Sequence, residues 1–430
     1  MNARVQKLAV LAVLVTGVGA RPAAAQDWPQ WRGANRDAKV IGFVAPTTWP
    51  QQLTEKWKVV VGDGVATPAV VGDKIYVFTR QDGNEVVRCL DAATGQEIWQ
   101  DKYETQGVSG AASQFSGPRS SPAVADGRVV TQGVQGILSC YDADAGKLLW
   151  RNEDYRGSTP RFATASSPIL TAGLCIAQLG GQDDGAMVAY DLATGDQTWK
   201  WAGDTPSYGS PVLMHVGGTQ VIAAPTEQNM VAINVADGRL LWQVPFTQGR
   251  YNAATPIIDG QTLIYALQGT TAEKLTLTAD GIETEQLWNN SDATVVFNSP
   301  VLKDGLIFGL SGTNSIFCVR ADTGEMAWTA PLDAGAPAAP SPRPKEEAGT
   351  GRRGRGGGGR GGFGSIVDAG SVLFALAPAG RLVVFEPSDK EFKQVASYQV
   401  AAGSAYAYPV IAGNRVFVKD AEALTLWTIE

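Results

Sequence analysis

A pattern that returns about every 40–50 residues constrains the fold of this chain more than any other feature. Its first element is a small residue and a proline directly before an apolar run, as in "ATPAVVGDKIYVF" and "SSPAVADGRVVTQ". These prolines are Pro68, Pro122, Pro168, Pro211, Pro256, Pro300 and Pro409. A period of this length is typical of proteins built from repeated structural units.

The second element is a turn whose glycine stands four residues before a tryptophan, as in "DAATGQEIW". Around Gly281 the spacing stretches before Trp288, so that repeat is degenerate. Three short, β-branched apolar runs lie between proline and tryptophan, and the tryptophan run makes a fourth. Because Asp-Gly or Thr-Gly turns bound these runs, each repeat predicts four antiparallel strands.

Four antiparallel strands repeated radially form the blade of a β-propeller. Seven repeats begin with proline, and "GSIVDAGSVLFAL" makes an eighth, in which Gly364-Ser365 replaces Ser-Pro. The last repeat ends after a third strand, and the N-terminal "LTEKWKV" supplies Trp57 at the fourth-strand position. The sequence therefore predicts an all-β, eight-bladed propeller of four-stranded antiparallel blades. An N-terminal strand closes the ring and removes two exposed sheet edges.

The tryptophans repeat with the blades and share the same local neighbours, so we predict that they anchor one blade to the next. The predicted anchors are Trp57, Trp99, Trp150, Trp199, Trp242, Trp288 and Trp328. Cys89, Cys140 and Cys318 fall at the same repeat position, and equivalent positions in different blades are usually too far apart to form disulfides, while Cys175 lies in another strand. We therefore expect buried, unpaired thiols.

Two segments lie outside the repeats. Residues 1–25 combine Arg4 and Lys7, an apolar run and a final Ala-Ala-Ala, which predicts a signal peptide and a periplasmic or secreted protein. Its removal changes the net charge from −7 to −10, which argues against nucleic acid as a partner. No later run approaches transmembrane length. Residues 337–362 are rich in glycine and arginine, which predicts a disordered insertion between blades six and seven.

We assign residues 26–52 to an N-terminal arm and residues 53–430 to the propeller. The arm carries "DWPQWRG", and we expect Trp28, Trp31 and Arg32 to wrap across one face and lock the ring. A partner-binding tail is the alternative interpretation of the same motif.

The candidate ligand-binding residues precede the strand-starting prolines. Because the first strand of each blade lines the central channel, these residues are expected to surround one channel mouth. They are Arg119, Ser120, Tyr208, Arg250, Tyr251, Asn252, Asn298, Tyr406 and Tyr408. Aromatic rings, two arginines and amides at one mouth suit an anionic or polar ligand. The alternative is that they fill the channel and satisfy loop carbonyls.

Four segments carry a family resemblance: "DWPQWRG" at residues 27–33, "GPRSSP" at 117–122, "SYGSP" at 207–211 and "FNSPVLKDGLIFG" at 297–309. With these motifs the chain resembles the PQQ-binding-like β-propeller repeat proteins. Their superfamily includes quinoprotein alcohol dehydrogenases and the outer-membrane assembly propeller lipoprotein. The dehydrogenases imply bound PQQ and a calcium ion. This chain departs from them because no two of its cysteines are adjacent, and it lacks the lipidated cysteine of the lipoprotein.

The sequence therefore predicts an exported, monomeric, non-catalytic binding or assembly scaffold whose partner is an envelope protein or polysaccharide. No catalytic residue, metal site or cofactor is assigned, since the chain contains a single histidine and none of the common nucleophile or nucleotide motifs. Two alternatives stay open: a PQQ-dependent quinoprotein oxidoreductase and a carbohydrate-binding propeller of the cell envelope.

Overall fold

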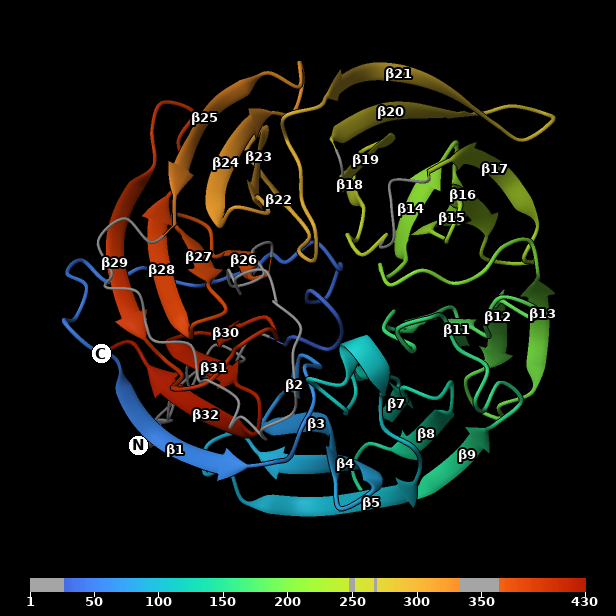
Figure 1. The fold of residues 1–430 in the computed structure, drawn as a ribbon, viewed down its shortest axis with the longest axis horizontal. Coiled ribbons are helices and arrows are strands. Elements are labelled where there is room, and N and C mark those ends of the chain that lie inside the picture. Colours follow the sequence, from blue (N-terminus) through green and yellow to red (C-terminus); the bar gives the residue numbers. More distant parts are fainter. Residues whose placement is uncertain (1–26, 247–251, 267–268, 333–362) are drawn as a thin grey trace, which may run out of the picture.

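Eight four-stranded antiparallel sheets stand around a central axis and form a closed ring (Figure 1). This computed structural model describes residues 27–246, 252–266, 269–332 and 363–430. The predicted signal peptide and the Gly/Arg-rich insertion lie outside the described residues. The predicted eight-bladed propeller is confirmed. Within the described ranges, no helix is long and apolar enough to cross a membrane.

In every blade the first strand of the repeat is innermost and the fourth strand lies at the rim. The strands of the first four blades have these bounds: β2 (Ala69–Val71), β3 (Lys74–Gln81), β4 (Asn84–Asp91), β5 (Glu97–Glu104); β6 (Ala123–Ala125), β7 (Arg128–Gln132), β8 (Leu138–Asp142), β9 (Leu148–Asn152); β10 (Ile169–Thr171), β11 (Leu174–Leu179), β12 (Ala186–Asp191), β13 (Gln197–Trp201); β14 (Val212–Val216), β15 (Thr219–Pro225), β16 (Asn229–Asn234), β17 (Leu240–Pro245).

The last four blades follow the same order. Their strands are β18 (Ile257–Asp259), β19 (Thr262–Ala266), β20 (Thr270–Leu277), β21 (Ile282–Asn290); β22 (Val301–Lys303), β23 (Leu306–Leu310), β24 (Ser315–Arg320), β25 (Met326–Pro331); β26 (Ser365–Asp368), β27 (Leu373–Leu376), β28 (Arg381–Glu386), β29 (Lys393–Gln399); β30 (Val410–Ala412), β31 (Arg415–Lys419), β32 (Ala423–Thr428), β1 (Thr54–Val60). One short 3₁₀ turn, η1 (Gly110–Ala112), lies between blades 1 and 2.

The N-terminal strand closes the ring as the sequence predicts. Strand β1 pairs antiparallel with β32, and the register places Thr54 opposite Thr428 and Val60 opposite Ala423. Blade 8 thus combines the two ends of the propeller sequence. The edge of β32 that would otherwise be exposed is paired with β1.

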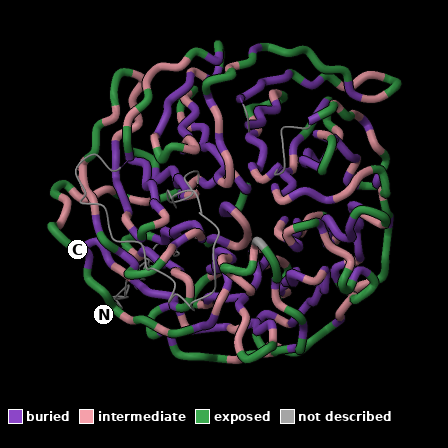
Figure 2. Tube along the Cα trace, viewed as in Figure 1, coloured by how far each residue is buried: buried purple, intermediate pink, exposed green. Residues whose placement is uncertain are grey.

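The core follows the two middle strands of each blade. Strand β28, for example, buries four consecutive residues, because both of its faces are covered by neighbouring blades. Exposed residues gather at the rim of the ring and in the turns (Figure 2). All four cysteines are buried and unpaired, as their repeat positions predict, and burial raises the pKa of the Cys89 thiol to about 12.

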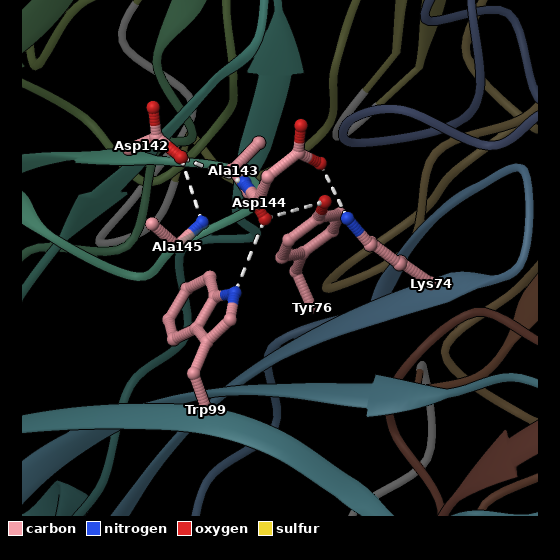
Figure 3. Close-up of polar contacts among 7 residues, drawn as sticks. All are labelled: Lys74, Tyr76, Trp99, Asp142, Ala143, Asp144 and Ala145. Atoms are coloured by element: carbon pink, nitrogen blue, oxygen red, sulfur yellow. Dashed lines mark hydrogen bonds and ion pairs between the residues drawn. The ribbon is translucent and has the colours of Figure 1, made fainter.

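The junction between blades 1 and 2 shows how neighbouring blades are joined (Figure 3). The indole N–H of Trp99, on β5, donates to the carbonyl of Ala143 in the third-to-fourth-strand turn of blade 2, at 3.1 Å. The Tyr76 hydroxyl donates to the same carbonyl at 3.1 Å. Asp142 accepts the Ala145 amide at 2.7 Å, which shapes this turn and lowers the pKa of the Asp142 carboxyl.

The same junction recurs around the ring. Each indole N–H donates to the turn of the next blade in these pairs: Trp57 to Ala92, Trp99 to Ala143, Trp150 to Leu192, Trp199 to Val235, Trp288 to Ala321 and Trp328 to Ser388. The turn glycine of the next blade faces the indole so closely that a Cβ atom there would come nearer than 3.0 Å to the ring. These pairs are Gly95 with Trp57, Gly146 with Trp99, Gly195 with Trp150, Gly238 with Trp199 and Gly324 with Trp288. The glycine of the sequence repeat is therefore the residue against which the preceding blade's tryptophan packs.

Trp242 lies differently. It packs against the cluster between blades 4 and 5 beside Val244 and Leu277. The glycine of the degenerate repeat, Gly281, faces the Leu241 carbonyl instead of an indole. The reason is the length of the hairpin of β20 and β21, eight and nine residues, which projects beyond the rim (Figure 1). The stretched spacing before Trp288 reflects this long hairpin.

We expect Gly195→Ala to destabilise the protein more than Gly83→Ala. Both glycines have φ of +81°, but an added Cβ at Gly195 would lie 2.7 Å from Cγ of Trp150, whereas Gly83 has open space. Each substitution costs about 1–2 kcal/mol for the left-handed backbone. Gly195→Ala loses roughly 1–3 kcal/mol more by overpacking. Urea denaturation measures both, and equal losses would contradict this account of the junction.

Candidate functional site

The N-terminal arm enters the central channel from the side of the first-to-second-strand turns. The Asp27 carboxylate accepts the Gly72 amide of such a turn at 2.8 Å. Trp28 then exchanges two backbone hydrogen bonds with Val70 of β2, of 2.7 and 2.9 Å. The next residue, Pro29, accepts the Val124 amide of β6 at 2.8 Å. The arm thus supplies partners to the free inner edges of blades 1 and 2.

The returning half of the arm follows blade 7. Ala38 accepts the Asp368 amide at 2.9 Å, and the Val40 amide donates to the Asp368 carbonyl at 2.7 Å. Beyond this point Phe43 and Trp49 pack against Phe374 on β27. In Figure 1 this blue segment passes between the rim and the middle of the ring. The arm therefore forms a plug inside the channel, deeper than the wrap across one face that the sequence predicts.

Two buried arginines hold the tip of the plug. The Arg32 guanidinium donates to the carbonyls of Ser299 and Pro300 in blade 6, at 2.9 and 2.7 Å. The Arg36 guanidinium donates to the carbonyls of Ser167 and Pro168 in blade 3, at 2.9 and 2.8 Å. Both side chains are almost fully buried. These bonds satisfy carbonyls on two widely separated blades with donors from one short segment.

A circle of hydroxyls surrounds the tip. At five of the seven positions directly before a strand-starting proline, a buried hydroxyl accepts the backbone N–H of the preceding blade's equivalent residue. We call this set the hydroxyl belt; its bonds run from Thr67 to Ser121, Ser121 to Ser167, Ser167 to Ser210, Thr255 to Ser299 and Tyr408 to Thr67. The indole N–H of Trp31 donates to Thr255 of the belt at 2.8 Å. The belt explains why a small hydroxyl residue precedes so many of the prolines, a reason that the sequence pattern alone did not provide.

The opposite mouth of the channel carries a row of half-buried aromatic side chains. They come from the connections between successive blades, and Tyr208, Phe297 and Tyr406 each stand three residues before the strand-starting proline. This aromatic row consists of Phe115, Phe162, Tyr208, Phe297, Phe363 and Tyr406. Ring centroids lie 5.0 Å apart for Phe115 and Tyr406, 4.7 Å for Phe363 and Tyr406 and 4.4 Å for Phe297 and Phe363. Rings from four different connections therefore meet near the axis.

Arg119 fixes the loop that carries η1 over this mouth. Its guanidinium donates to the carbonyls of Ala112 and Phe115 at 3.0 and 3.1 Å. Burial lowers the pKa of Arg119, and the nearby Asp63 carboxylate opposes that shift. Tyr208 lies beside Phe162 in the row, and its hydroxyl accepts a hydrogen bond from the Phe162 amide at 3.2 Å.

The remaining candidate residues point away from the mouth or lie below it. Asn252 donates to the carbonyls of Thr226 and Phe246, and Asn298 donates to the carbonyl of Leu310. Ser120 is fully buried. Tyr408 lies deep in the channel, where its hydroxyl accepts a hydrogen bond from Arg32 at 3.0 Å. Arg250 and Tyr251 lie outside the described residues. Of the candidates, the mouth brings together Arg119, Tyr208 and Tyr406.

Phe115, Phe162, Phe297 and Phe363 were missed by the sequence analysis. Only Phe363 lacks an adjacent charged or amide residue, and Phe297 even stands directly before the candidate Asn298, so a polar neighbour alone did not identify these rings. The signal that could have found Phe297 is its register, three residues before Pro300, which is the same as that of Tyr406 before Pro409.

PQQ with calcium does not fit the residues at the channel. Calcium takes six to eight oxygen ligands, largely carboxylates. Within the described part of the chain, no three histidine, cysteine, aspartate or glutamate side chains are grouped to hold a metal ion. The channel itself is occupied by Trp31, Arg32 and Arg36 of the plug. No catalytic step through that cofactor follows from this geometry.

A family model described as "Outer membrane protein assembly factor BamB" matches residues 46–203 and 82–330. The curated "Outer membrane protein assembly factor BamB" of Burkholderia pseudomallei (strain K96243) is 26% identical over 234 residues, which cover 50% of this chain and 55% of that protein. The chain thus matches about half the length of that relative.

Two solved structures share the fold. The crystal structure of BamB from Moraxella catarrhalis has a TM-score of 0.61 at 14% identity and covers 88% of this chain and 98% of that chain. Quinohemoprotein alcohol dehydrogenase ADHIIG from Pseudomonas putida HK5 has a TM-score of 0.65 at 14% identity and covers 94% of this chain and 80% of that chain. At this identity the likeness extends to the fold alone, and the same fold hosts unrelated functions.

We expect Arg32→Met to destabilise the protein by about 2–4 kcal/mol, because buried carbonyls of blade 6 lose charged donors. Arg156→Met is the control, since the Arg156 guanidinium is exposed and its ion pair with Glu153 contributes less than about 1 kcal/mol. Thermal and urea denaturation measure both variants. A loss from Arg32→Met no larger than that of the control would contradict the role of the plug.

Proposed function

The chain belongs to the PQQ-like β-propeller family whose model is described as "Outer membrane protein assembly factor BamB", and from this premise we propose that it is a non-catalytic binding scaffold of the cell envelope. Its partner is a protein that docks on the aromatic row. We extend to this chain the assembly role that the names of its BamB relatives describe.

The aromatic row is the observation that carries the proposal. Six aromatic side chains stay half-buried around one mouth, and Arg119 lies among them. Aromatic residues and arginine are enriched at the centres of protein interfaces, where they contribute most of the binding energy. They stand on connections held by rigid blades, the usual place for binding residues.

The plug in the channel supports binding of the partner at the surface of the ring and not passage of a ligand through the ring. Because the arm occupies the channel and its tip contacts the hydroxyl belt, a protein partner docks at the mouth and does not pass through the ring. The rings of the row also pack on one another, as in the stacked pair Phe297 and Phe363. A surface on which four rings touch one another suits a protein partner better than separate slots for single sugar rings.

We expect a photo-reactive phenylalanine analogue at position 162 to cross-link to a defined partner in cells that produce the full chain. The same analogue at position 392 is the matched control, because Phe392 is also a half-buried phenylalanine but packs at the rim beside Trp328 and Phe385. The measurement is the number and mass of cross-linked species identified by mass spectrometry.

One protein recovered repeatedly from position 162 and not from position 392 supports the proposal. Equal recovery from both positions, or a polysaccharide adduct at position 162, would overturn it. The oxidoreductase alternative has its own readout. Saturable binding of PQQ with calcium at or below ~1 μM in calorimetry would favour it, at a free energy of about −8 kcal/mol or stronger.

A further inference from the structure

The plug does not cover the channel wall evenly. Its backbone pairs with blades 7, 1 and 2, and Arg36 faces blade 3. On the remaining side, between the plug and blades 4, 5 and 6, lies a cavity of about 220 Å³. Leu213, Ile258 and Leu302 occupy equivalent positions in these blades, two residues after the proline, and form its apolar wall.

The plug side of this cavity is positively charged. Arg32, Arg36 and Lys39 line it together with one carboxylate, Asp37. Asp37 turns one oxygen to the Lys39 amide, at 3.2 Å. The wall facing the aliphatic side chains therefore carries three cations and one anion.

In the described part of the chain, no carboxylate forms an ion pair with either of the two buried arginines. Their guanidiniums bond to backbone carbonyls of blades 6 and 3. The Nε of Arg36 is buried and has no hydrogen-bond partner among the described residues. Burial and the neighbouring charge of Arg32 lower the pKa of Arg36 to about 9. A buried cation of this kind gains most from an anion that can approach it.

We propose that this cavity binds a small carboxylate with an apolar tail. The carboxylate faces Arg36 and Lys39, and the tail lies on Leu213, Ile258 and Leu302. An apolar cavity of about 150 Å³ holds benzene, so 220 Å³ accommodates a ring or short chain with its acid group. The exposed residue Asn35 marks the side from which the cavity opens. This inference does not rest on the proposed partner at the aromatic row, which lies at the opposite mouth.

Calorimetry and thermal shift of the whole protein test the proposal with benzoate, hexanoate, benzyl alcohol and inorganic phosphate at pH 7. We expect saturable binding of benzoate or hexanoate. Benzyl alcohol, which has the same ring without the charge, binds at least about tenfold more weakly because it lacks a charge-assisted hydrogen bond. Phosphate, which has no apolar part, gives no comparable stabilisation.

Two pairs of variants locate the site. Lys39→Met weakens benzoate binding by about tenfold, whereas Lys58→Met, at an exposed lysine of β1, leaves it unchanged. Leu213→Trp fills the cavity and abolishes binding, whereas Leu170→Trp, at the same strand position in blade 3, does not. Ile258→Phe serves as a second filling variant if Leu213→Trp fails to fold.

Three results would overturn the proposal. Equal binding of benzoate and benzyl alcohol would show that the site does not recognise the negative charge. Equal binding of benzoate and phosphate would show that it does not recognise the apolar tail. Benzoate binding that survives both Lys39→Met and the filling variants would place the ligand elsewhere. The proposal also fails if neither carboxylate binds up to about 10 mM, which corresponds to a free energy weaker than about −3 kcal/mol.

Discussion

The inner edges of eight sheets meet around one axis, and their backbone N–H and C=O groups must find partners there. Buried groups of this kind are almost always hydrogen-bonded. The chain meets this requirement twice. The hydroxyl belt joins neighbouring blades through side chains, and the arm adds backbone bonds to Val70, Val124 and Asp368 with arginine donors between them. The plug is in this sense a part of the fold, although it lies outside the repeats.

Much of the ring could be predicted because each repeat carries the same local sequence pattern. Proline starts the inner strand, and a glycine turn receives the preceding tryptophan, as Gly195 receives Trp150. Strand β1 could be placed in blade 8 because Trp57 stands at a fourth-strand position. The path of the arm could not be predicted. It depends on contacts of Arg32 and Arg36 with blades more than 130 residues away, and these contacts leave no periodic signal.

In the candidate site, too, the features that follow the repeat could be predicted from the sequence, and those that depend on distant contacts could not. Arg119, Tyr208 and Tyr406, which were selected by their position before a proline, lie at one mouth, because register is a local property. It could not separate them from Asn252, whose amide turns to loop carbonyls, or from Tyr408, which meets Arg32 within the channel. The direction of a side chain depends on its three-dimensional neighbours. Family membership adds the fold and leaves activity open, since assembly factors and dehydrogenases share it.

Hydrogen–deuterium exchange of the full chain tests most directly whether the arm is an integral plug. The amides of Trp28, Ala38 and Val40 each donate a backbone hydrogen bond within the channel. The account predicts that they exchange as slowly as amides of the middle strands, such as Val383 of β28, because they open only when the ring opens. Exchange of these three amides at the rate of exposed loops, with the blades still protected, would contradict it.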